Sequence, residues 1–362
     1  MMNFYKVGTN FDLALLDGLN RLNQKYSNNK VIEVYGSDRQ TANLSARPDF
    51  RLPLLDKKQI EEYVKKAAEY GIKFNYTLNS FFPYGSKKGF IEHIDDIKHV
   101  INFLEEIGVY RITVANPILL ELIRNVIHSD INIELSTCAH IDAITQIKYM
   151  YEKYNVTKIC NNLIKNRDFD FLQAAGAYCD KNNIIYELMV NEFCGVGGID
   201  FATHCVYRDS CYMCHATNKT LEDANSFNEY PMRICSKSRN ENPANWLKLR
   251  FIRPEDIPLY NEVGINHFKI TGRTGSTDYI LKTVESYMKQ DFDGNILNLW
   301  KPLESIKENK SEFSDEYKFY DIPNKSLNGF LEMWTKQHKK CEYEVCGETC
   351  KYCDSWYDKY CK

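Results

Sequence analysis

Short runs rich in β-branched and aromatic residues alternate along this chain with longer amphipathic stretches such as LDKKQIEEYVKKAAEYG and IDDIKHVINFLEEIG. The runs are typical of strands in a parallel sheet, and the stretches have the periodicity of helices that cover such a sheet. Gly71 and Gly108 follow two of the expected helices, where a glycine commonly ends a helix. The expected strands begin at Val31, Ile72, Arg111, Ile131, Val156, Ile184, Trp246 and His267.

Repeated β/α units within roughly 250 residues predict a (β/α)8 TIM-like barrel in the α/β class. An open doubly wound sheet is the alternative, but no GxGxxG turn follows the first expected strand. The segment 191–245 is too long for an ordinary connection of about 2–6 residues. We therefore expect a barrel over 1–288 with a cysteine-rich insertion at 191–245 after the sixth strand. A C-terminal cysteine-rich extension would follow over 289–362.

Most of the thirteen cysteines fall into two groups, one in the insertion and one in the extension. Four thiolates at one point hold a zinc ion or an iron–sulfur cluster. Free thiols and disulfides are the alternatives, but disulfide frameworks suit short secreted domains, and no secretory signal is recognisable in the first residues. The insertion contains Cys194, Cys205, Cys211, Cys214 and Cys235, and the extension contains Cys341, Cys346, Cys350, Cys353 and Cys361.

The tail cysteines Cys341, Cys346, Cys350 and Cys353 have the tight spacing of a zinc knuckle or of a second cluster. The last three also match the CxxxCxxC triplet of radical S-adenosylmethionine enzymes. That triplet belongs after the first strand of a barrel, whereas here it lies in the tail. We expect the tail to hold a second cluster or zinc, with Cys361 as a spare thiol.

Charge, apolar runs and the absence of known motifs narrow the function classes. The formal net charge of −3 and the absence of a basic domain leave nucleic acid open as a partner without indicating it. No apolar run approaches the roughly 20 residues that span a bilayer. There is no HExxH, GxSxG or Walker motif. We expect a cytoplasmic protein that acts on a small molecule, with a protein partner or electron donor left open.

Polar residues gather where the expected strands end, which is the active-site face of a barrel. They include Glu33, Tyr35, Glu187 and Lys269. Amides and arginines suit recognition of a carboxylate or another oxygen-rich small molecule. The alternative is that individual members are buried core polars or helix caps. The candidates for substrate binding are Asn75, Asn79, Asn116, Arg47, Arg250 and Arg253, and the candidates for catalysis are Asn191, Glu192 and Arg273.

A series of motifs, in order along the chain, resembles peptidase family U32, the collagenase-like peptidases. The motifs are VIEVYGSDRQ with ARPDFRLP, YGIKFNYTLN, RITVANPILLELI, ELMVNEFC, IRPEDIPLYNEVGINHFKITGR and CGETCKYC. The resemblance runs from about Lys6 to Cys353. It is nearest to a branch with a Val-Asn-Glu-x-Cys element and a cysteine-rich tail.

The resemblance implies a barrel with a 4Fe-4S cluster held by four cysteines. Relatives act in oxygen-independent hydroxylation of tRNA, ribosomal RNA or the ubiquinone ring, in some with prephenate as the implied hydroxyl donor. By motif, Cys194, Cys205 and Cys235 would be ligands, and the fourth ligand falls on Cys211 or Cys214. The gap GVGGIDFATH between the first two is longer than that branch usually has.

The expected function is therefore an iron–sulfur-dependent oxidoreductase. It would carry out an oxygen-independent hydroxylation-type or related group-transfer reaction on a small carboxylate-bearing or biosynthetic substrate. A metal-assisted peptidase or peptide-modifying enzyme, with Glu187 or Glu192 as base, is one alternative. A non-catalytic iron–sulfur partner subunit is the other, since a fold alone does not establish a function.

Overall fold

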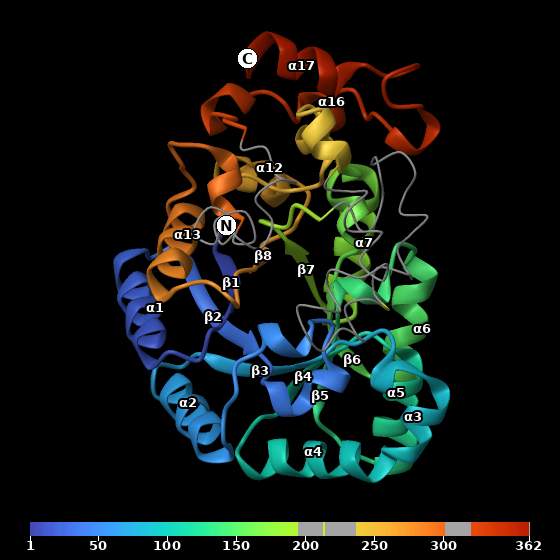
Figure 1. The fold of residues 1–362 in the computed structure, drawn as a ribbon. Helices are drawn as coiled ribbons and strands as arrows, with labels where there is room; N and C mark the ends of the chain where they lie inside the picture. Colours follow the sequence, from blue (N-terminus) through green and yellow to red (C-terminus); the bar gives the residue numbers. More distant parts are fainter. Residues whose placement is uncertain (195–212, 214–236, 301–319, 362) are drawn as a thin grey trace.

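Eight parallel strands close into a barrel in sequence order (Figure 1). The computed structural model describes residues 1–194, 213, 237–300 and 320–361. The barrel closes where Phe4 and Tyr5 pair with His267 and Phe268. The strands are β1 (Asn3–Gly8), β2 (Asn29–Gly36), β3 (Lys73–Leu78), β4 (Arg111–Val114), β5 (Asn132–Leu135), β6 (Val156–Cys160), β7 (Ile185–Met189) and β8 (His267–Ile270). The predicted (β/α)8 barrel is confirmed.

Helices surround the barrel and several begin at side-chain caps (Figure 1). Asp12 caps α1 (Leu13–Lys25), and Asp56 forms a capping box with Gln59 at the start of α2 (Lys57–Glu69). The other helices are α3 (Lys87–Glu92), α4 (Ile94–Glu106), α5 (Pro117–Glu121), α6 (Ile144–Tyr154), α7 (Phe169–Lys181), α11 (Asn245–Lys248), α12 (Ile257–Glu262), α13 (Thr277–Lys289), α16 (Glu332–Thr335) and α17 (Tyr352–Tyr360). A π-helical turn spans Leu122–Ile127, and 3₁₀ turns span Arg39–Leu44, Asp49–Arg51, Pro83–Gly85, Thr137–Ala139, Leu163–Arg167, Pro254–Asp256, Ile296–Leu299, Asn324–Leu327 and Cys341–Tyr343.

Two strand predictions are wrong. The N-terminal segment NFYKVG forms β1, which the sequence analysis does not include, and the run beginning at Trp246 is not a strand. Residues 246–253 are buried throughout, and Trp246 packs 5.7 Å from the ring of Trp300. A short apolar run that is buried on all sides cannot be distinguished from a strand by periodicity alone. The insertion consequently follows the seventh strand, β7, and not the sixth.

The hydrophobic core continues from the barrel into the C-terminal residues. Leu327, Phe330, Trp334 and Tyr357 are buried in the same cluster as the apolar residues of the strands. Figure 1 shows α16 and α17 at one end of the molecule, and α17 packs against α11. The extension therefore packs against the barrel, while the domain boundary at 288/289 stays a prediction.

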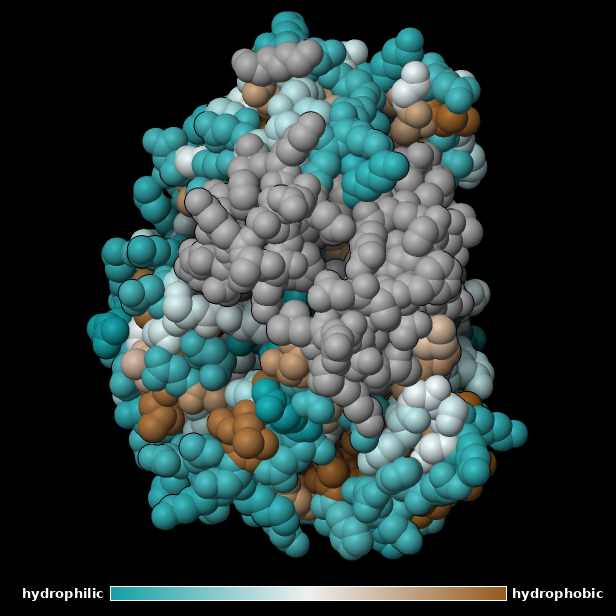
Figure 2. Space-filling view, viewed as in Figure 1, coloured by the Kyte–Doolittle hydropathy of each residue, from teal (hydrophilic) through white to brown (hydrophobic). Residues whose placement is uncertain are grey.

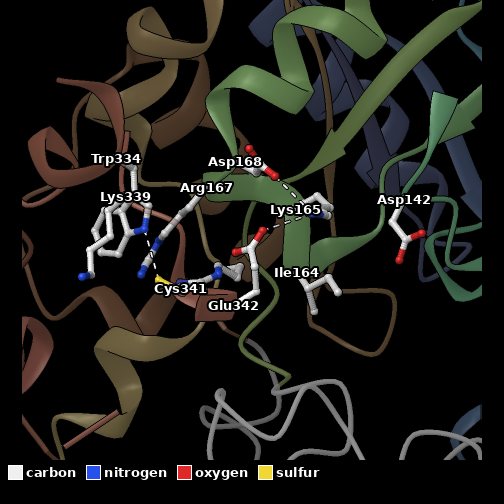
Figure 3. A pocket seen from close by; sticks show the side chains of 10 residues that line it. Asp142, Ile164, Lys165, Arg167, Asp168, Trp334, Lys339, Cys341 and Glu342 are labelled. Carbon is white, nitrogen blue, oxygen red and sulfur yellow. Dashed lines mark hydrogen bonds and ion pairs between the residues drawn. The ribbon is translucent and has the colours of Figure 1, made fainter. Parts of the chain in front are cut away.

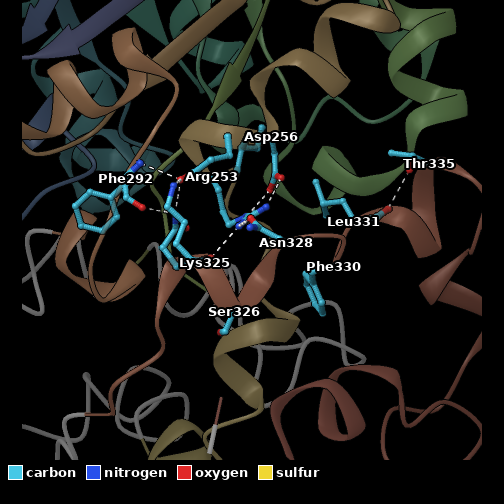
Figure 4. A network of polar contacts seen from close by, with 12 residues as sticks. Arg253, Asp256, Phe292, Lys325, Ser326, Asn328, Phe330, Leu331 and Thr335 are labelled. Atoms are coloured by element: carbon cyan, nitrogen blue, oxygen red, sulfur yellow. Dashed lines mark hydrogen bonds and ion pairs between the residues drawn. The ribbon is translucent and has the colours of Figure 1, made fainter. Parts of the chain in front are cut away.

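Arg253 is predicted to bind substrate. In the structure its guanidinium instead forms hydrogen bonds with Asp256 and with residues of the extension (Figure 4). Its Nε and Nη2 atoms lie 2.8 and 2.6 Å from the two carboxylate oxygens of Asp256. Its Nη1 donates to the carbonyl of Asn324 at 2.8 Å and to Asn328 Oδ1 at 3.1 Å. Each nitrogen of this buried guanidinium thus has a protein partner, which makes Arg253 part of the scaffold.

Among the residues that are coloured in Figure 2, hydrophilic ones predominate and apolar ones form small separate patches. The large apolar residues that are exposed include Leu54, Ile91 and Ile118. None of the helices in the described ranges combines the length and the apolar character needed to cross a bilayer.

Candidate functional site

The middle of the barrel is a layer of polar residues to which every strand contributes one side chain. Each of them is at most 3% exposed. In strand order they are Lys6, Glu33, Asn75, Thr113, Glu134, Lys158, Glu187 and Lys269. Glu33, Glu187 and Lys269, expected at the mouth, therefore lie in this buried layer. Lys6, Glu134 and Lys158 are not among the predicted site residues, although each is a charged residue inside an otherwise apolar strand.

Two lysines and two glutamates connect opposite walls of the barrel in this layer. The Nζ atom of Lys6 lies 2.7 Å from Glu33 Oε1 and 2.5 Å from Glu134 Oε2. The Nζ atom of Lys158 lies 2.9 Å from Glu33 Oε2 and 3.3 Å from Glu134 Oε1. Burial opposes the charge on Glu33, but Lys158 and Lys6 hold its pKa well below the usual value. Because these charges neutralise one another, the layer forms a rigid floor beneath the mouth.

At the carboxyl ends of the strands, Arg47 and Arg273 belong to one hydrogen-bonded group. Arg273 follows β8, and its Nη1 donates to Ser37 Oγ at 3.2 Å. Ser37 Oγ lies 3.4 Å from Ser45 Oγ, which accepts the backbone N–H of Arg47. Gly8 makes room for this arrangement, since a Cβ there would lie 2.8 Å from Arg273 Cγ. The loop after β2 and the end of β8 thus bring two guanidinium groups together.

The two guanidinium groups are like charges that lie close enough to interact. Burial and the Arg47 charge lower the pKa of Arg273 to about 9, so it remains a cation at neutral pH. The Nε atoms of both arginines are buried and have no hydrogen-bond partner among the residues that the structure describes. The Cζ atom of Arg273 also lies 5.5 Å from the ring centroid of Tyr35. Guanidinium groups with free N–H donors are well suited to bind a carboxylate.

Glu192 lies beside this pair, just after β7. Burial raises its pKa, although the Arg47 charge and hydrogen bonds from Cys194 and Trp300 act in the opposite direction. Its Oε1 accepts the backbone N–H of Cys194 at 3.0 Å. A carboxyl group with a raised pKa is suited to proton transfer near neutral pH. Glu192 therefore joins the two arginines to the first cysteine of the insertion.

The predicted amides divide between the site and the scaffold. Asn79 lies close to Arg47, because its Oδ1 accepts the backbone N–H of Ala46, the residue before Arg47, at 3.2 Å. Asn75 belongs to the buried layer, where its Oδ1 accepts from Thr113 at 2.6 Å. Asn116 caps α5 through the N–H groups of residues 118 and 119, and Asn191 bonds to the backbone of residues 271 and 299. The last two amides are engaged in holding the backbone.

Arg250 lies at a different place, in a pocket of about 210 Å³ between the barrel and the tail (Figure 3). Arg167 and Cys341 line the same pocket. Cys341 Sγ accepts a hydrogen bond from Trp334 Nε1 at 3.3 Å. The structure therefore associates Arg250 with the tail cysteines and not with Arg47 and Arg273.

The structure describes only some of the predicted cysteine ligands. Cys194 is exposed at the start of the insertion, whereas Cys205, Cys211, Cys214 and Cys235 lie outside the described residues. Cys341, Cys346, Cys350 and Cys353 are all partly buried. Within the part of the chain that the structure describes, no three His, Cys, Asp or Glu side chains are arranged to hold a metal ion.

Residues 28–161 match the family model described as peptidase family U32. An uncharacterised protease of Methanocaldococcus jannaschii is 24% identical over 308 residues, which cover 83% of this chain and 80% of that protein. The solved structure of the U32 peptidase Mk0906 has a TM-score of 0.44 and 12% identity, covering 75% of this chain and 93% of that one. A GH113 β-1,4-mannanase has a TM-score of 0.41 and 10% identity, covering 80% and 99%. The family match over residues 28–161 and the M. jannaschii relative thus show similarity to the U32 peptidase family, the family that the motifs resemble.

Proposed function

We propose that this chain is an enzyme that binds a small carboxylate-bearing substrate between Arg47 and Arg273 at the barrel mouth. An iron–sulfur cluster held by the insertion would serve an oxygen-independent hydroxylation-type or related group-transfer reaction. The observation that carries this proposal is the pair of guanidinium groups whose buried Nε atoms have no hydrogen-bond partner within the described ranges. A carboxylate would supply the missing acceptors and offset the two positive charges.

Each residue at this site has a distinct role in the proposed reaction. Arg47 and Arg273 bind and orient the carboxylate, and Ser37 holds the Arg273 guanidinium in place. Glu192 is placed to hold or move a proton beside the bound substrate. The buried layer below closes the barrel and keeps water from entering from that side.

The donor set of the insertion is suited to a cluster. Cys194, Cys205 and Cys235, with Cys211 or Cys214, would supply four thiolates. Cys194 is exposed and lies two residues from Glu192, so the insertion starts at the mouth. When bound, an iron–sulfur cluster supplies redox or Lewis-acid chemistry.

Peptide hydrolysis is the second candidate, because the family and the M. jannaschii relative are named as peptidases or proteases. Of the two carboxylates considered as base, Glu187 is 2% exposed and lies 3.7 Å from Lys158. Glu192 is more accessible and has a raised pKa. A hydrolytic reaction would therefore use Glu192.

Replacing Arg273 by alanine is expected to weaken binding of a carboxylate ligand by about ten- to hundred-fold, since a charge-assisted hydrogen bond is lost. Prephenate and malonate are suitable probes, with Kd measured by calorimetry. Arg21→Ala, which removes an exposed arginine of α1, is the matched control and should leave Kd unchanged. Unchanged binding in both Arg273→Ala and Arg47→Ala would show that the site lies elsewhere.

Anaerobically purified protein is expected to be brown and to contain iron and acid-labile sulfide. Cys194→Ser, Cys205→Ser and Cys235→Ser should each lose the iron of one cluster, because each removes a thiolate ligand. Cys179→Ala is the control, since this thiol is buried in α7. A colourless wild-type protein that contains zinc but no sulfide would contradict the cluster.

A further inference from the structure

A buried arginine beside the tail has no anionic partner among the described residues. Arg167 follows β6 and is 2% exposed. Its Nη1 donates to the carbonyl of Leu247 at 2.8 Å, but its Nε and Nη2 have no hydrogen-bond partner. The buried guanidinium of Arg250 lies near enough to lower the pKa of Arg167 further, after the larger effect of burial. Two positive charges are thus buried next to one another.

The surroundings of Arg167 are aromatic. Its Cζ lies 4.8 Å from the ring centroid of Trp334, 5.0 Å from that of Phe330 and 5.4 Å from that of Phe251. Cation–π contacts stabilise a guanidinium, but less than the loss of water destabilises a buried charge. A buried ion is normally accompanied by a counter-ion.

The carboxylates of the pocket already have other partners. Asp168 lies 3.1 Å from Lys165 and also pairs with Lys340. Glu342 lies 3.6 Å from Lys165. Lysines therefore neutralise Asp168 and Glu342, and the third carboxylate of the pocket, Asp142, accepts a hydrogen bond from Asn162 at 3.3 Å. Since Arg167 pairs with none of the three, its counter-ion is expected to be a different kind of group.

The groups that converge on the two arginines are the tail thiols. Figure 3 shows the Arg167 side chain reaching toward Cys341 beside Trp334. Cys353 Sγ contacts, at 4.0 Å, the same Leu247 carbonyl that accepts from Arg167. Arg167, Arg250 and Cys341 also line the same pocket.

The backbone also brings the thiols together. Cys346 and Cys350 form an isolated parallel bridge, and the N–H of Gly347 donates to the carbonyl of Cys350 at 2.8 Å. Gly347 has φ +87°, a left-handed conformation that glycine adopts without strain. The sequence CGETC thus folds into a turn that presents two cysteines side by side.

We infer that Cys341, Cys346, Cys350 and Cys353 bind a metal centre, one zinc ion or one iron–sulfur cluster, whose negative charge is the counter-ion of Arg167. Four thiolates exceed the positive charge of either centre, so the complex is an anion. As the described residues are placed, no three of these thiols are arranged to hold a metal ion. Binding therefore draws segment 341–353 together around the metal, as in many small thiolate sites.

Such a centre would fasten the tail to the barrel, because its neighbours come from three parts of the chain. Arg167 follows β6, Leu247 belongs to α11, and Trp334 belongs to α16. The proposed ligands include neither the cysteines of the insertion nor the pair Arg47 and Arg273. The test of the tail site is therefore independent of the function proposed for the barrel mouth.

The test is a count of zinc, iron and acid-labile sulfide in the full chain, purified anaerobically. Cys346→Ser and Cys353→Ser should each lose one zinc ion or one cluster relative to the wild type. Cys361→Ser is the matched control, since this tail thiol instead contacts Ser326 Oγ at 3.3 Å and should keep the metal. Iron with sulfide identifies a cluster, and zinc alone identifies a zinc site. Equal metal contents in all four proteins would overturn the inference.

Two further measurements do not require that a cysteine variant folds. In the wild type, the four thiols should resist alkylation until a chelator removes the metal. Immediate labelling of all four, or their isolation as disulfides, would overturn the inference. Arg167→Met should weaken metal retention against the chelator by about 10–100-fold, as for other residues that support metal ligands. Unchanged retention would show that the centre is not the counter-ion of Arg167.

Discussion

Replacing Lys158 by methionine is expected to lower the free energy of unfolding by about 3–5 kcal/mol. The lysine Nζ lies 2.9, 3.3 and 3.7 Å from carboxylate oxygens of Glu33, Glu134 and Glu187, all within the buried layer of the barrel. Methionine fills a similar volume but removes the positive charge. Three buried carboxylates would then share Lys6 as their nearest cation, and the pKa of Glu134, already raised by burial and by Glu33, would rise further.

Chemical denaturation at neutral pH measures this change. Lys148→Met is the matched control, because Lys148 is exposed on α6 and lies 3.8 Å from Glu152, one turn away. A surface pair of this kind contributes about 0.3–0.5 kcal/mol. The double variant Lys158→Met with Glu33→Gln should recover part of the loss by removing one uncompensated charge. A single variant as stable as the control would mean that the layer does not depend on its charges.

Replacing Arg253 by methionine is expected to have a comparable effect, about 3–5 kcal/mol, because it leaves the nearly buried carboxylate of Asp256 without its cation. The carbonyl of Asn324 would also lose its hydrogen bond from the guanidinium. Loss of these contacts should loosen the extension, so protease sensitivity after residue 320 should increase together with the loss of stability.

The control for Arg253 lies in the same network. Lys325 is 42% exposed and pairs with Glu255 at 2.7 Å and with Asp291. Lys325→Met should change the free energy of unfolding by at most about 1 kcal/mol, since exposed ion pairs are screened by solvent. Equal effects of the two substitutions would argue against a scaffold role for Arg253 beyond that of a surface residue.

The barrel could be predicted because its strands and helices alternate, and both periodicities are local properties of the sequence. β1 is the exception, and the run at Trp246 is misread because burial on all sides removes the alternation that marks a strand. That error has a consequence for the site. Arg250 and Arg253 were expected at a strand end, whereas they belong to a buried connection that contacts the tail and the extension.

The rule that barrel sites gather at strand ends does bring Arg273 and Glu192 together, and Arg47 with them. The pairing within the buried layer could not be predicted in this way. Lys6 and Glu134 are separated by 128 positions, so only the closed barrel places them in contact. The spacing of the tail cysteines predicts a group of thiols, but nothing local to the tail indicates that Arg167 lies against them.

The pairing of β1 with β8 has a consequence for biosynthesis. Phe4 leaves the ribosome roughly 260 residues before its partner His267, so β1 waits through most of translation for one of its two neighbours. Until then the nascent chain carries an open sheet with two unpaired edges, a form that invites association with other chains. The insertion and its cysteines are synthesised during this interval. Chaperone assistance and slow translation should therefore matter most in the stretch that precedes β8.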